Sequence, residues 1–362
     1  MFYLKSLKLN NFRCYKEYYQ EFTPKINIII GDNAVGKTSI IEGIYVLGVT
    51  KSHKAAIDNE MIKHNEEFSL IKGEFKGDKT DVVTLSLTEK GKQIIKNEKK
   101  IKHLSEYLGF YYSVLFCPED VEIIKGAPAI KRRFLDINIG QLNQTYLNNL
   151  IDYRKILKDR NKMLKEFQER DDFNKELLDI YTKQLISKAK DIILTRQEFI
   201  KKLNVYFKKQ VSLISDGKED AYIKYMPNTT IENIEKDYKE KEKVDFITKT
   251  TNVGPHRDDF IVYFNEHESI YASQGQQKTF ALALKLALID ILKEKSNKII
   301  VILDDVFGEL DIIRQKEIIK LLEIDYQIFI TTTSIDHLNS DVLRNSNIIR
   351  INKEGEYNGR SL

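Results

Sequence analysis

A glycine-rich segment near the amino terminus places a lysine and a hydroxyl residue at the spacing that suits phosphate binding. Its sequence, GDNAVGKTS, fits the P-loop pattern without a mismatch. Glycines let the backbone N–H groups of such a loop turn toward an anion, and the helix that follows adds the positive end of its dipole. We expect Lys37 to reach the β- and γ-phosphates of a nucleotide and the hydroxyl of Thr38 to hold Mg²⁺. The predicted nucleotide-binding residues of this loop are Gly31, Asp32, Asn33, Ala34, Val35, Gly36, Lys37, Thr38 and Ser39.

A second candidate site follows the apolar run of residues 299–303, which ends in Asp304 and Asp305. A carboxylate inside a buried strand is costly to desolvate, so the pair should emerge at the carboxyl edge of a sheet. Asp304 is then placed to bind Mg²⁺, and Asp305 to orient or deprotonate an attacking water. Together with Lys37, these two residues are the predicted catalytic groups. The two motifs point to hydrolysis of a nucleoside triphosphate.

The strands and helices that must position these motifs read as an α/β pattern. Residues 25–30 form an almost solidly apolar run before the P-loop, as a central strand should, and residues 40–49 follow it as a helix. The basic stretch 89–102 is expected as a solvated hairpin tip. Further strands are expected at 3–10, 68–76, 81–92, 221–226, 259–264, 298–305, 327–333 and 347–352, and helices at 275–294 and near 311–322.

Residues 141–210 differ from the rest, since they contain no proline or glycine and repeat apolar side chains at helical spacing. The polar segment 168–174 is the expected turn between two antiparallel helices. The two apolar stripes consist of Leu150, Tyr153, Leu157, Leu164 and Phe167, and of Leu178, Tyr181, Leu185, Ile192 and Phe199. The sequence therefore predicts a strand-rich α/β head that is interrupted by a helical insert.

The segment YASQGQQ (271–277), which opens the helix expected at 275–294, resembles the signature motif of ABC-type ATPases. In that superfamily the motif acts in trans, so that ATP is sandwiched between two protomers. The resemblance implies that Ser273, Gly275 and Gln276 contact the nucleotide of a partner. The segment at 309–311 resembles the D-loop that crosses the dimer interface, which adds Asp311 to the expected ATP-binding residues.

Further motifs narrow the resemblance to the RecF family of recombination mediators, over about residues 4–352. The first of them implies that Arg13 lies on the adenine side of the nucleotide. Thr331 to Thr333 stand where a transporter of the superfamily has its switch histidine, and residues 118–120 are the expected counterpart of the Q-loop. The motifs are LNNFRCY (9–15), KSHK (51–54), PED (118–120), KGAP (125–128), KRRFLD (131–136), GPHRDD (254–259) and LDDVFGELD (303–311).

The resemblance implies an ABC-type, SMC/Rad50-like P-loop ATPase head with an inserted helical arm. The head is expected to comprise residues 1–120 and 215–362, and the arm residues 121–214. Such a protein would dimerise around ATP and Mg²⁺, hydrolyse ATP slowly with stimulation by DNA, and bind duplex and gapped DNA at single-strand junctions. It would work with RecR and RecO to load RecA in gap repair, with roles in the SOS response and replication restart.

Charge distribution gives separate support for DNA binding. The whole chain has a net charge of +4, whereas residues 125–170 contain eleven basic and five acidic side chains. A basic arm on a near-neutral head is typical of phosphate-backbone contact, although a solvated helix face would show the same charges. A second candidate patch is formed by Lys96, Lys99, Lys100 and Lys102. The predicted DNA contacts are Lys51, Lys54, Lys131, Arg132, Arg133, Arg154, Lys155 and Lys158.

Several other functions fit less well. No apolar run is long enough to span a membrane, and the two cysteines are too few for a disulfide framework, which favours a cytoplasmic protein without membrane contact. A transporter subunit would need the switch histidine. A Rad50 or SMC head would need hundreds of heptad residues between its motifs, and a small-molecule kinase would not need a signature helix. ATP acting mainly as a dimerisation switch stays open.

Overall fold

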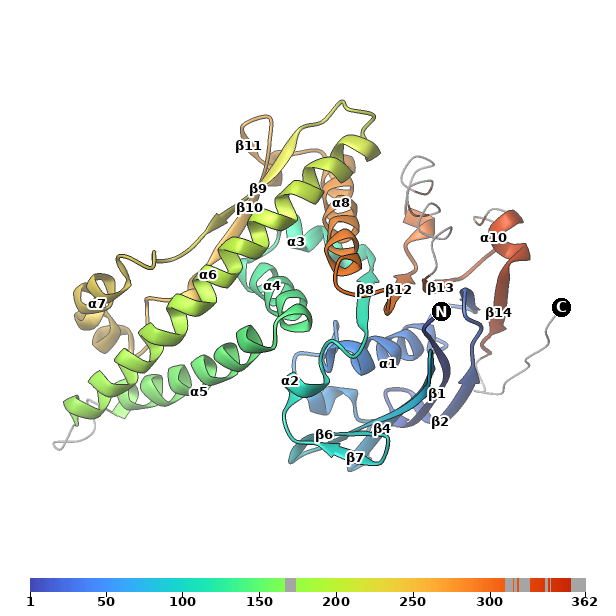
Figure 1. Cartoon of the computed structure of the whole chain (residues 1–362), viewed down its shortest axis with the longest axis horizontal. Coiled ribbons are helices and arrows are strands. Elements are labelled where there is room, and N and C mark those ends of the chain that lie inside the picture. The colour runs from blue at the N-terminus through green and yellow to red at the C-terminus, as the bar shows by residue number, and fades with distance from the viewer. Residues whose placement is uncertain are drawn as a thin grey trace. The chain divides into compact units, whose positions relative to one another are not determined.

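The computed structural model describes residues 1–166, 174–309, 326–335 and 340–352, together with 315, 318 and 338. The chain forms two compact units, the first from residues 1–120 and 288–362 and the second from residues 121–287 (Figure 1). The second unit therefore holds residues 215–287 in addition to the expected arm. The functional division into head and arm stays a prediction.

A parallel five-stranded sheet forms the centre of the first unit. Its strands lie in the order β14-β3-β13-β12-β8, and each neighbouring pair is parallel. Strands that are covered on both faces read as continuous apolar runs, and four of these five are buried throughout. The sequence did not predict β8. The bounds are β3 Ile26–Ile30, β8 Tyr112–Phe116, β12 Ile299–Asp304, β13 Gln327–Thr332 and β14 Ser346–Arg350.

A six-stranded antiparallel sheet completes the first unit, in the order β2-β1-β4-β5-β6-β7. The expected single strand at 81–92 is wrong, because the chain reverses after Thr88 and Gly91, at φ +122°, opens the next strand. The expected hairpin tip at 89–102 accordingly contains β6 and β7, and β2 was not predicted. The bounds are β1 Tyr3–Phe12, β2 Tyr15–Glu21, β4 Phe68–Lys76, β5 Thr80–Thr88, β6 Gly91–Lys96 and β7 Lys99–Ile101.

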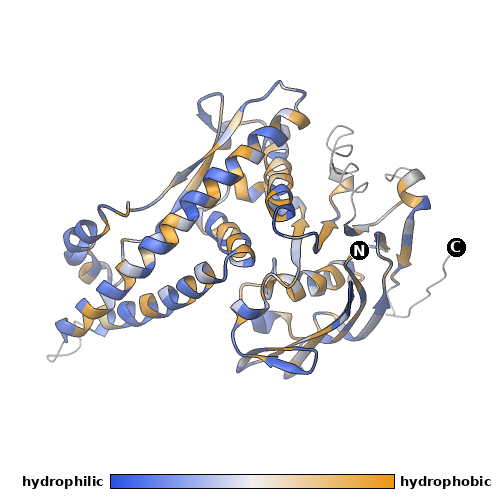
Figure 2. Cartoon of the chain, viewed as in Figure 1, coloured by the Kyte–Doolittle hydropathy of each residue, from blue (hydrophilic) through white to orange (hydrophobic). Residues whose placement is uncertain are grey.

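Helix α1 (Lys37–Val49) packs against strands of both sheets and is buried along almost its whole length. In Figure 2, α1 is largely orange, as expected for a helix without a solvent-facing stripe. The expected helix near 311–322 falls largely outside the described residues. The short elements of this unit are η1 Asp58–Met61, α2 Leu104–Tyr107, η2 Pro118–Val121, η5 Phe307–Glu309 and α10 Ser340–Arg344.

The second unit is built on the predicted helical hairpin, in which α5 packs along α6. The stripe residues are buried at Leu150, Tyr153 and Leu164 on one helix and at Leu178, Leu185, Ile192 and Phe199 on the other. The expected turn at 168–174 lies outside the described residues except for Asn174, whose side chain accepts the Leu177 N–H and caps α6. The helices are α3 Glu122–Lys125, α4 Pro128–Leu142, α5 Gln144–Glu166, α6 Lys175–Ile214, α7 Ile234–Thr248 and α8 Gln274–Lys293.

Strand β10 (Asp259–Phe264) pairs antiparallel with β9 (Ala221–Met226) and with β11 (His267–Glu268), which confirms the two longer strands expected here. The 3₁₀ turns η3 (Pro255–Arg257) and η4 (Ser269–Tyr271) precede β10 and α8. Across the described part of the chain, no helix is long and apolar enough to cross a membrane.

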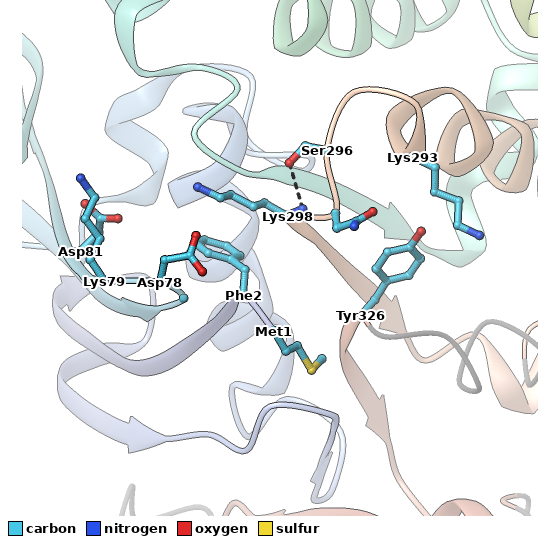
Figure 3. Close-up of a pocket in the computed structure, with 11 residues that line it drawn as sticks. Met1, Phe2, Asp78, Lys79, Asp81, Lys293, Ser296, Lys298 and Tyr326 are labelled. Carbon is cyan, nitrogen blue, oxygen red and sulfur yellow. Dashed lines mark hydrogen bonds between the residues drawn. The ribbon is translucent and has the colours of Figure 1, made fainter.

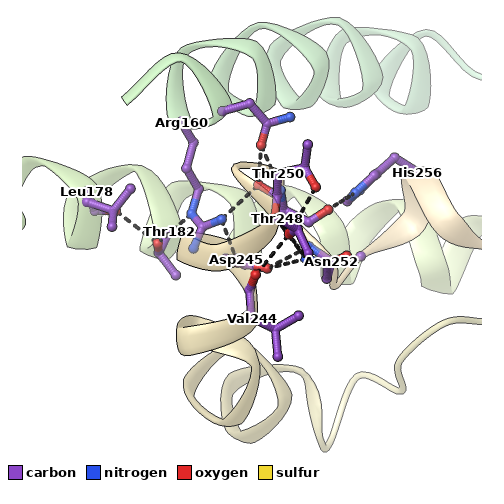
Figure 4. A network of polar contacts seen from close by, with 12 residues as sticks. Arg160, Leu178, Thr182, Val244, Asp245, Thr248, Thr250, Asn252 and His256 are labelled. Atoms are coloured by element: carbon purple, nitrogen blue, oxygen red, sulfur yellow. Dashed lines mark hydrogen bonds and ion pairs between the residues drawn. The ribbon is translucent and has the colours of Figure 1, made fainter. Parts of the chain in front are cut away.

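Two arginines of the hairpin helices are buried in ion pairs within the second unit. Arg160 donates through Nη1 to Asp245 at 2.8 Å and to the Thr251 hydroxyl at 2.7 Å, in the network of Figure 4. Arg196 pairs with Asp136 and Asp258, each at 2.8 Å. Both arginines are 1% exposed. Part of the basic charge of this unit therefore lies in buried ion pairs inside the unit.

His256, in the GPHRDD segment, is held in one tautomer by its neighbours. Its Nε2 lies 3.0 Å from the Thr251 carbonyl oxygen, which can only accept, so Nε2 carries the proton. Nδ1 then accepts from the Tyr153 hydroxyl at 2.6 Å. Burial lowers the pKa of His256 to about 4. The segment thus contributes a neutral, hydrogen-bonded histidine to the interior of this unit.

We expect Arg160→Met to destabilise the protein by about 3–5 kcal/mol, because the change leaves the buried Asp245 carboxylate without its cation. The double variant Arg160→Met/Asp245→Leu should be less destabilised than the single one. Lys162→Met, on the same helix with a side chain 76% exposed, is the control and should change little. Urea denaturation measures all three, and equal losses in the single and double variants would contradict the ion-pair account.

The lowered pKa of His256 predicts a pH-dependent stability. In the unfolded chain this histidine is protonated below about pH 6.5. In the folded chain it stays neutral until about pH 4. The free energy of unfolding should therefore fall with decreasing pH in this window, by at most about 1.4 kcal/mol per pH unit from this group. His256→Gln should show a shallower pH slope in urea denaturation between pH 7 and 4.5. Parallel slopes would rule out this role.

Candidate functional site

The P-loop connects β3 to α1, so it stands between the buried strand and the helix that the motif requires. Ala34 at φ +65° and Gly36 at φ +108° alternate with ordinary conformations and turn the loop's N–H groups inward. Gly36 caps α1 without a side-chain hydrogen bond, and the first turn of the helix carries no acidic residue. The backbone N–H groups at the start of a helix are suited to bind an anion.

Two glycines of the loop are required by their surroundings. A Cβ on Gly31 would lie 2.5 Å from the carbonyl oxygen of Ile351, and one on Gly36 would lie 2.6 Å from the Tyr15 hydroxyl. The positive φ of Gly36 also disfavours any residue with a side chain. The two glycines thus allow close approach of a backbone carbonyl on one side of the loop and of a tyrosine side chain on the other.

The ammonium of Lys37 lies within the loop, where Nζ donates to the carbonyl oxygens of Gly31 at 2.6 Å and Asp32 at 2.8 Å. Burial lowers the pKa of Lys37, and the carboxylates of Asp305 and Asp304 oppose that shift. The group is therefore a poorly hydrated cation with flexible donors, in a position to exchange its carbonyl partners for phosphate oxygens.

Asp304 ends β12 with its side chain buried. Its Oδ1 lies 3.4 Å from the Thr38 hydroxyl and accepts from the Thr331 hydroxyl at 2.7 Å, while Oδ2 lies 3.8 Å from the ammonium of Lys54. Burial raises the pKa of Asp304. Residues 118–120, the expected Q-loop counterpart, supply the carboxylate of Glu119, whose charge acts in the same direction. The oxygens of Thr38 and Asp304 form a hard donor set of the kind that Mg²⁺ binds.

Thr331, on the neighbouring strand β13, connects the two acidic residues and was given no role by the sequence. Its hydroxyl donates to Asp304 and accepts the backbone N–H of Asp305 at 2.9 Å. Asp305 has a positive φ of +53° and an exposed side chain. Thr331 therefore fixes the direction in which the Asp305 carboxylate leaves the strand. The only sequence signal was the run of threonines at the end of an apolar strand.

Glu42, on α1, is the second site residue that the sequence did not single out. Its carboxylate is 2% exposed and accepts from Arg13 Nε at 2.8 Å and Nη2 at 2.6 Å. It also accepts from the hydroxyl of Ser52, which in turn accepts the backbone N–H groups of Lys54 and Ala55. The expected adenine-side residue Arg13 and the KSHK segment are thereby tied to the helix that follows the P-loop.

The signature residues begin α8 in the second unit. Ser273 Oγ accepts the N–H of Gln276 at 3.2 Å, and Gln276 Oε1 accepts the N–H of Ser273 at 3.0 Å. This reciprocal pair is a capping box, which starts the helix and leaves Ser273 and Gly275 exposed. Asp311, the expected D-loop contact, lies outside the described residues.

The predicted DNA contacts fall into two groups. Lys131 is 7% exposed, with Nζ 3.6 Å from Asp259, and Lys54 lies at Asp304. Arg132 donates to the Asp258 carbonyl at 2.7 Å, and Arg154 pairs with Asp136 at 2.6 Å. Burial and pairing leave Lys131 out of any surface for DNA. The exposed members of the predicted set are Lys51, Lys54, Arg154, Lys155 and Lys158.

Comparison with known proteins gives a consistent match along the chain. Residues 3–356 match the family model of the RecF/RecN/SMC N terminal domain. The DNA replication and repair protein RecF of Clostridium perfringens (strain 13) is 38% identical over 358 residues, covering 96% of this chain and 98% of that protein. RecF of Bacillus velezensis is 38% identical over 363 residues, with the same coverage.

Solved structures agree with this match. A structure of the recombination mediator protein RecF with ATP, from the RecFOR pathway, has a TM-score of 0.90 at 33% identity and covers 99% of this chain and 98% of that one. The Smc head domain of Pyrococcus furiosus has a TM-score of 0.54 at 17% identity, with 100% and 96% coverage. The Smc likeness shows a shared ABC-type head fold.

We expect Thr331→Val to lower the rate of ATP hydrolysis about tenfold or more, since the loss of a buried hydrogen bond costs about 1–3 kcal/mol and this variant removes two. The variant keeps the shape of the side chain but frees both Asp304 and the backbone of Asp305. Thr333→Val, at an exposed position on the same segment, is the matched control. Steady-state hydrolysis and thermal melting should be measured together. An unchanged rate in a folded Thr331→Val protein would show that Thr331 does not position the carboxylates.

Proposed function

The chain belongs to the RecF family of DNA replication and repair proteins, with an ABC-type ATPase head, and from this premise we propose that it is an ATP-switched DNA-binding protein of recombinational gap repair. One observation carries the proposal. The Lys37 ammonium, the Thr38 hydroxyl and the Asp304 carboxylate meet beside a loop of inward N–H groups at the carboxyl edge of one sheet. That combination suits the polyphosphate of ATP and its metal ion.

In the proposed reaction, the P-loop amides and Lys37 bind the β- and γ-phosphates, and Thr38 and Asp304 hold Mg²⁺. The metal ion, when bound, neutralises charge on the phosphate oxygens. Asp305 orients and deprotonates the attacking water, and its exposed carboxylate supports that role. Thr331 is a positioning residue, because it acts on Asp305 and Asp304 through hydrogen bonds.

We propose that ATP closes a homodimer, in which Ser273, Gly275, Gln276 and Asp311 of one protomer contact the nucleotide of the other. The exposure of Ser273 and Gly275 at the start of α8 supports this role. Arg13 contributes on the adenine side, with its guanidinium held by Glu42. Slow hydrolysis would then reset the dimer.

The proposed DNA contacts of the second unit are Arg133 and the exposed lysines Lys155 and Lys158, and the first unit contributes the exposed Lys51. Their contacts are to the phosphate backbone of duplex and gapped DNA, so binding should weaken steeply with salt. Family membership further supports action in the cytoplasm with RecR and RecO in loading RecA, including replication restart and the SOS response.

The first experiment is ATP hydrolysis with and without duplex DNA, with sedimentation of the same samples. We expect ATP to produce a dimer and DNA to raise a slow hydrolysis rate. Lys37→Ala should abolish both effects, and Asp305→Asn should keep the dimer while it stops hydrolysis. A protein that stays monomeric with ATP and hydrolyses it at the same rate without DNA would refute the proposed function.

The exposed lysines of α5 give a separate prediction for DNA binding. Lys155→Glu/Lys158→Glu should weaken duplex binding and lower the salt slope by about 2, one for each lost phosphate contact. Lys239→Glu/Lys241→Glu, which reverses two exposed lysines of α7, is the control with the same total charge. Fluorescence anisotropy at several salt concentrations measures both. Equal losses in the two variants would mean that net charge, and not this surface, governs binding.

A further inference from the structure

A cavity of about 890 Å³ lies in the first unit, away from the P-loop. Lys293 and Tyr326 line one end, Asp78 and Lys79 the other, and Phe2 and Lys298 lie between them (Figure 3). Its volume is within the range of cavities that hold a ligand or a short segment of a partner. Every lining residue belongs to this unit, so the cavity lies within the first unit alone.

Three lysines of the cavity have no carboxylate partner within ion-pair distance in the described part of the chain. Lys298 Nζ lies 5.4 Å from the ring centre of Phe2, and Lys293 Nζ lies 5.7 Å from that of Tyr326. Lys79 is exposed in the turn between β4 and β5. Asp81 is already paired, because it lies 3.7 Å from Lys96 and accepts from Asn97. The cavity thus keeps excess positive charge over aromatic rings.

The neighbouring Lys96 lies close to the same group of positive charges. Burial lowers the pKa of its ammonium, the carboxylate of Asp81 opposes that shift, and the charges of Lys298 and Lys79 add to it. Lys96 Nζ also lies 3.6 Å from the ring centre of Phe110, and Lys298 Nζ lies 5.9 Å from the same ring centre. Lysines that converge in this way are relieved by an anionic partner.

Tyr326 supplies an unused hydrogen-bond donor. The residue is 3% exposed, and its hydroxyl has no hydrogen-bond partner among the described residues. A buried hydroxyl without a partner costs about 1–3 kcal/mol, which a ligand that accepts from it would recover. Burial raises the pKa of Tyr326 to about 12, which keeps the proton available for donation.

This cavity and the P-loop lie at opposite edges of the same sheet. Lys298 and Tyr326 immediately precede β12 and β13, whereas Asp304 ends β12 and Gly31 follows β3. Since these strands are parallel, the cavity is at their amino ends and the P-loop at their carboxyl ends. Six residues of strand separate the two by roughly 20 Å. A ligand in the cavity therefore leaves the nucleotide site accessible.

We propose that this cavity is a docking site for an acidic peptide segment of a partner protein, with carboxylates on Lys293, Lys298 and the Tyr326 hydroxyl and an apolar side chain against Phe2. Lysines bind carboxylates as single point charges. Asp78 opposes a continuous phosphodiester chain but can accept peptide N–H groups. A short acidic, partly aromatic segment satisfies all of these groups at once.

The test uses a fluorescein-labelled decapeptide of alternating aspartate and phenylalanine and the full chain, with fluorescence anisotropy as the readout. We expect saturable binding that weakens at least about tenfold in Lys293→Glu/Lys298→Glu and several-fold in Tyr326→Phe, which removes only the hydroxyl. Lys295→Glu, an exposed lysine of the same connection that does not line the cavity, is the matched control and should bind normally.

Each of the following outcomes either supports or refutes the proposed peptide site. A peptide with asparagine in place of aspartate should not bind, and ATP should neither compete with the acidic peptide nor be hydrolysed more slowly by Lys293→Glu/Lys298→Glu. Stronger displacement by a single-stranded DNA 12-mer or by inorganic triphosphate than by unlabelled peptide would assign the cavity to phosphates and overturn the peptide class. Binding that is equally weakened by Lys295→Glu, or no binding by the wild-type protein, would also refute it.

Discussion

The buried carboxylate of Asp304 is the group around which the first unit is organised. It lies under the loop that follows β3, and the neighbouring oxygen and nitrogen groups come from Thr38, Thr331 and Lys54. Burial of a carboxylate costs free energy unless charge and hydrogen bonds offset it, and here burial does raise its pKa. A divalent cation beside Thr38 would remove that cost. The site therefore favours the binding of a divalent cation beside this carboxylate.

The parallel sheet makes this arrangement possible, because the carboxyl ends of β3, β12 and β13 meet at one edge. Each strand delivers one part of the site: the P-loop from β3, the two acidic residues from β12 and Thr331 from β13. Helix α1 then carries Glu42, which connects Arg13 and Ser52 to the same helix that begins at Lys37. The other edge of the sheet carries the lysine and tyrosine cavity, so one rigid element presents two separate surfaces.

Local patterns allowed the core of the site to be predicted from the sequence. The P-loop and the acidic strand end are contiguous motifs, and their strand and helix contexts are written in neighbouring residues. Glu42, Thr331 and the cavity around Tyr326 depend on residues far apart in the chain, so no local pattern indicates them. Counting charges was least reliable, because it cannot distinguish an exposed lysine such as Lys155 from Lys131, which is buried beside Asp259. The single strand expected at 81–92 failed because its alternation continues through a tight reversal.

We propose that Asp304 and the P-loop form one site for ATP with its metal ion. Isothermal titration of ATP into the wild-type protein and Asp304→Asn, each with Mg²⁺ and with EDTA, tests it most directly. We expect Mg²⁺ to strengthen ATP binding to the wild-type protein. Asp304→Asn should lose that gain in affinity and retain the binding measured in EDTA. An equal gain from Mg²⁺ in both proteins would contradict it.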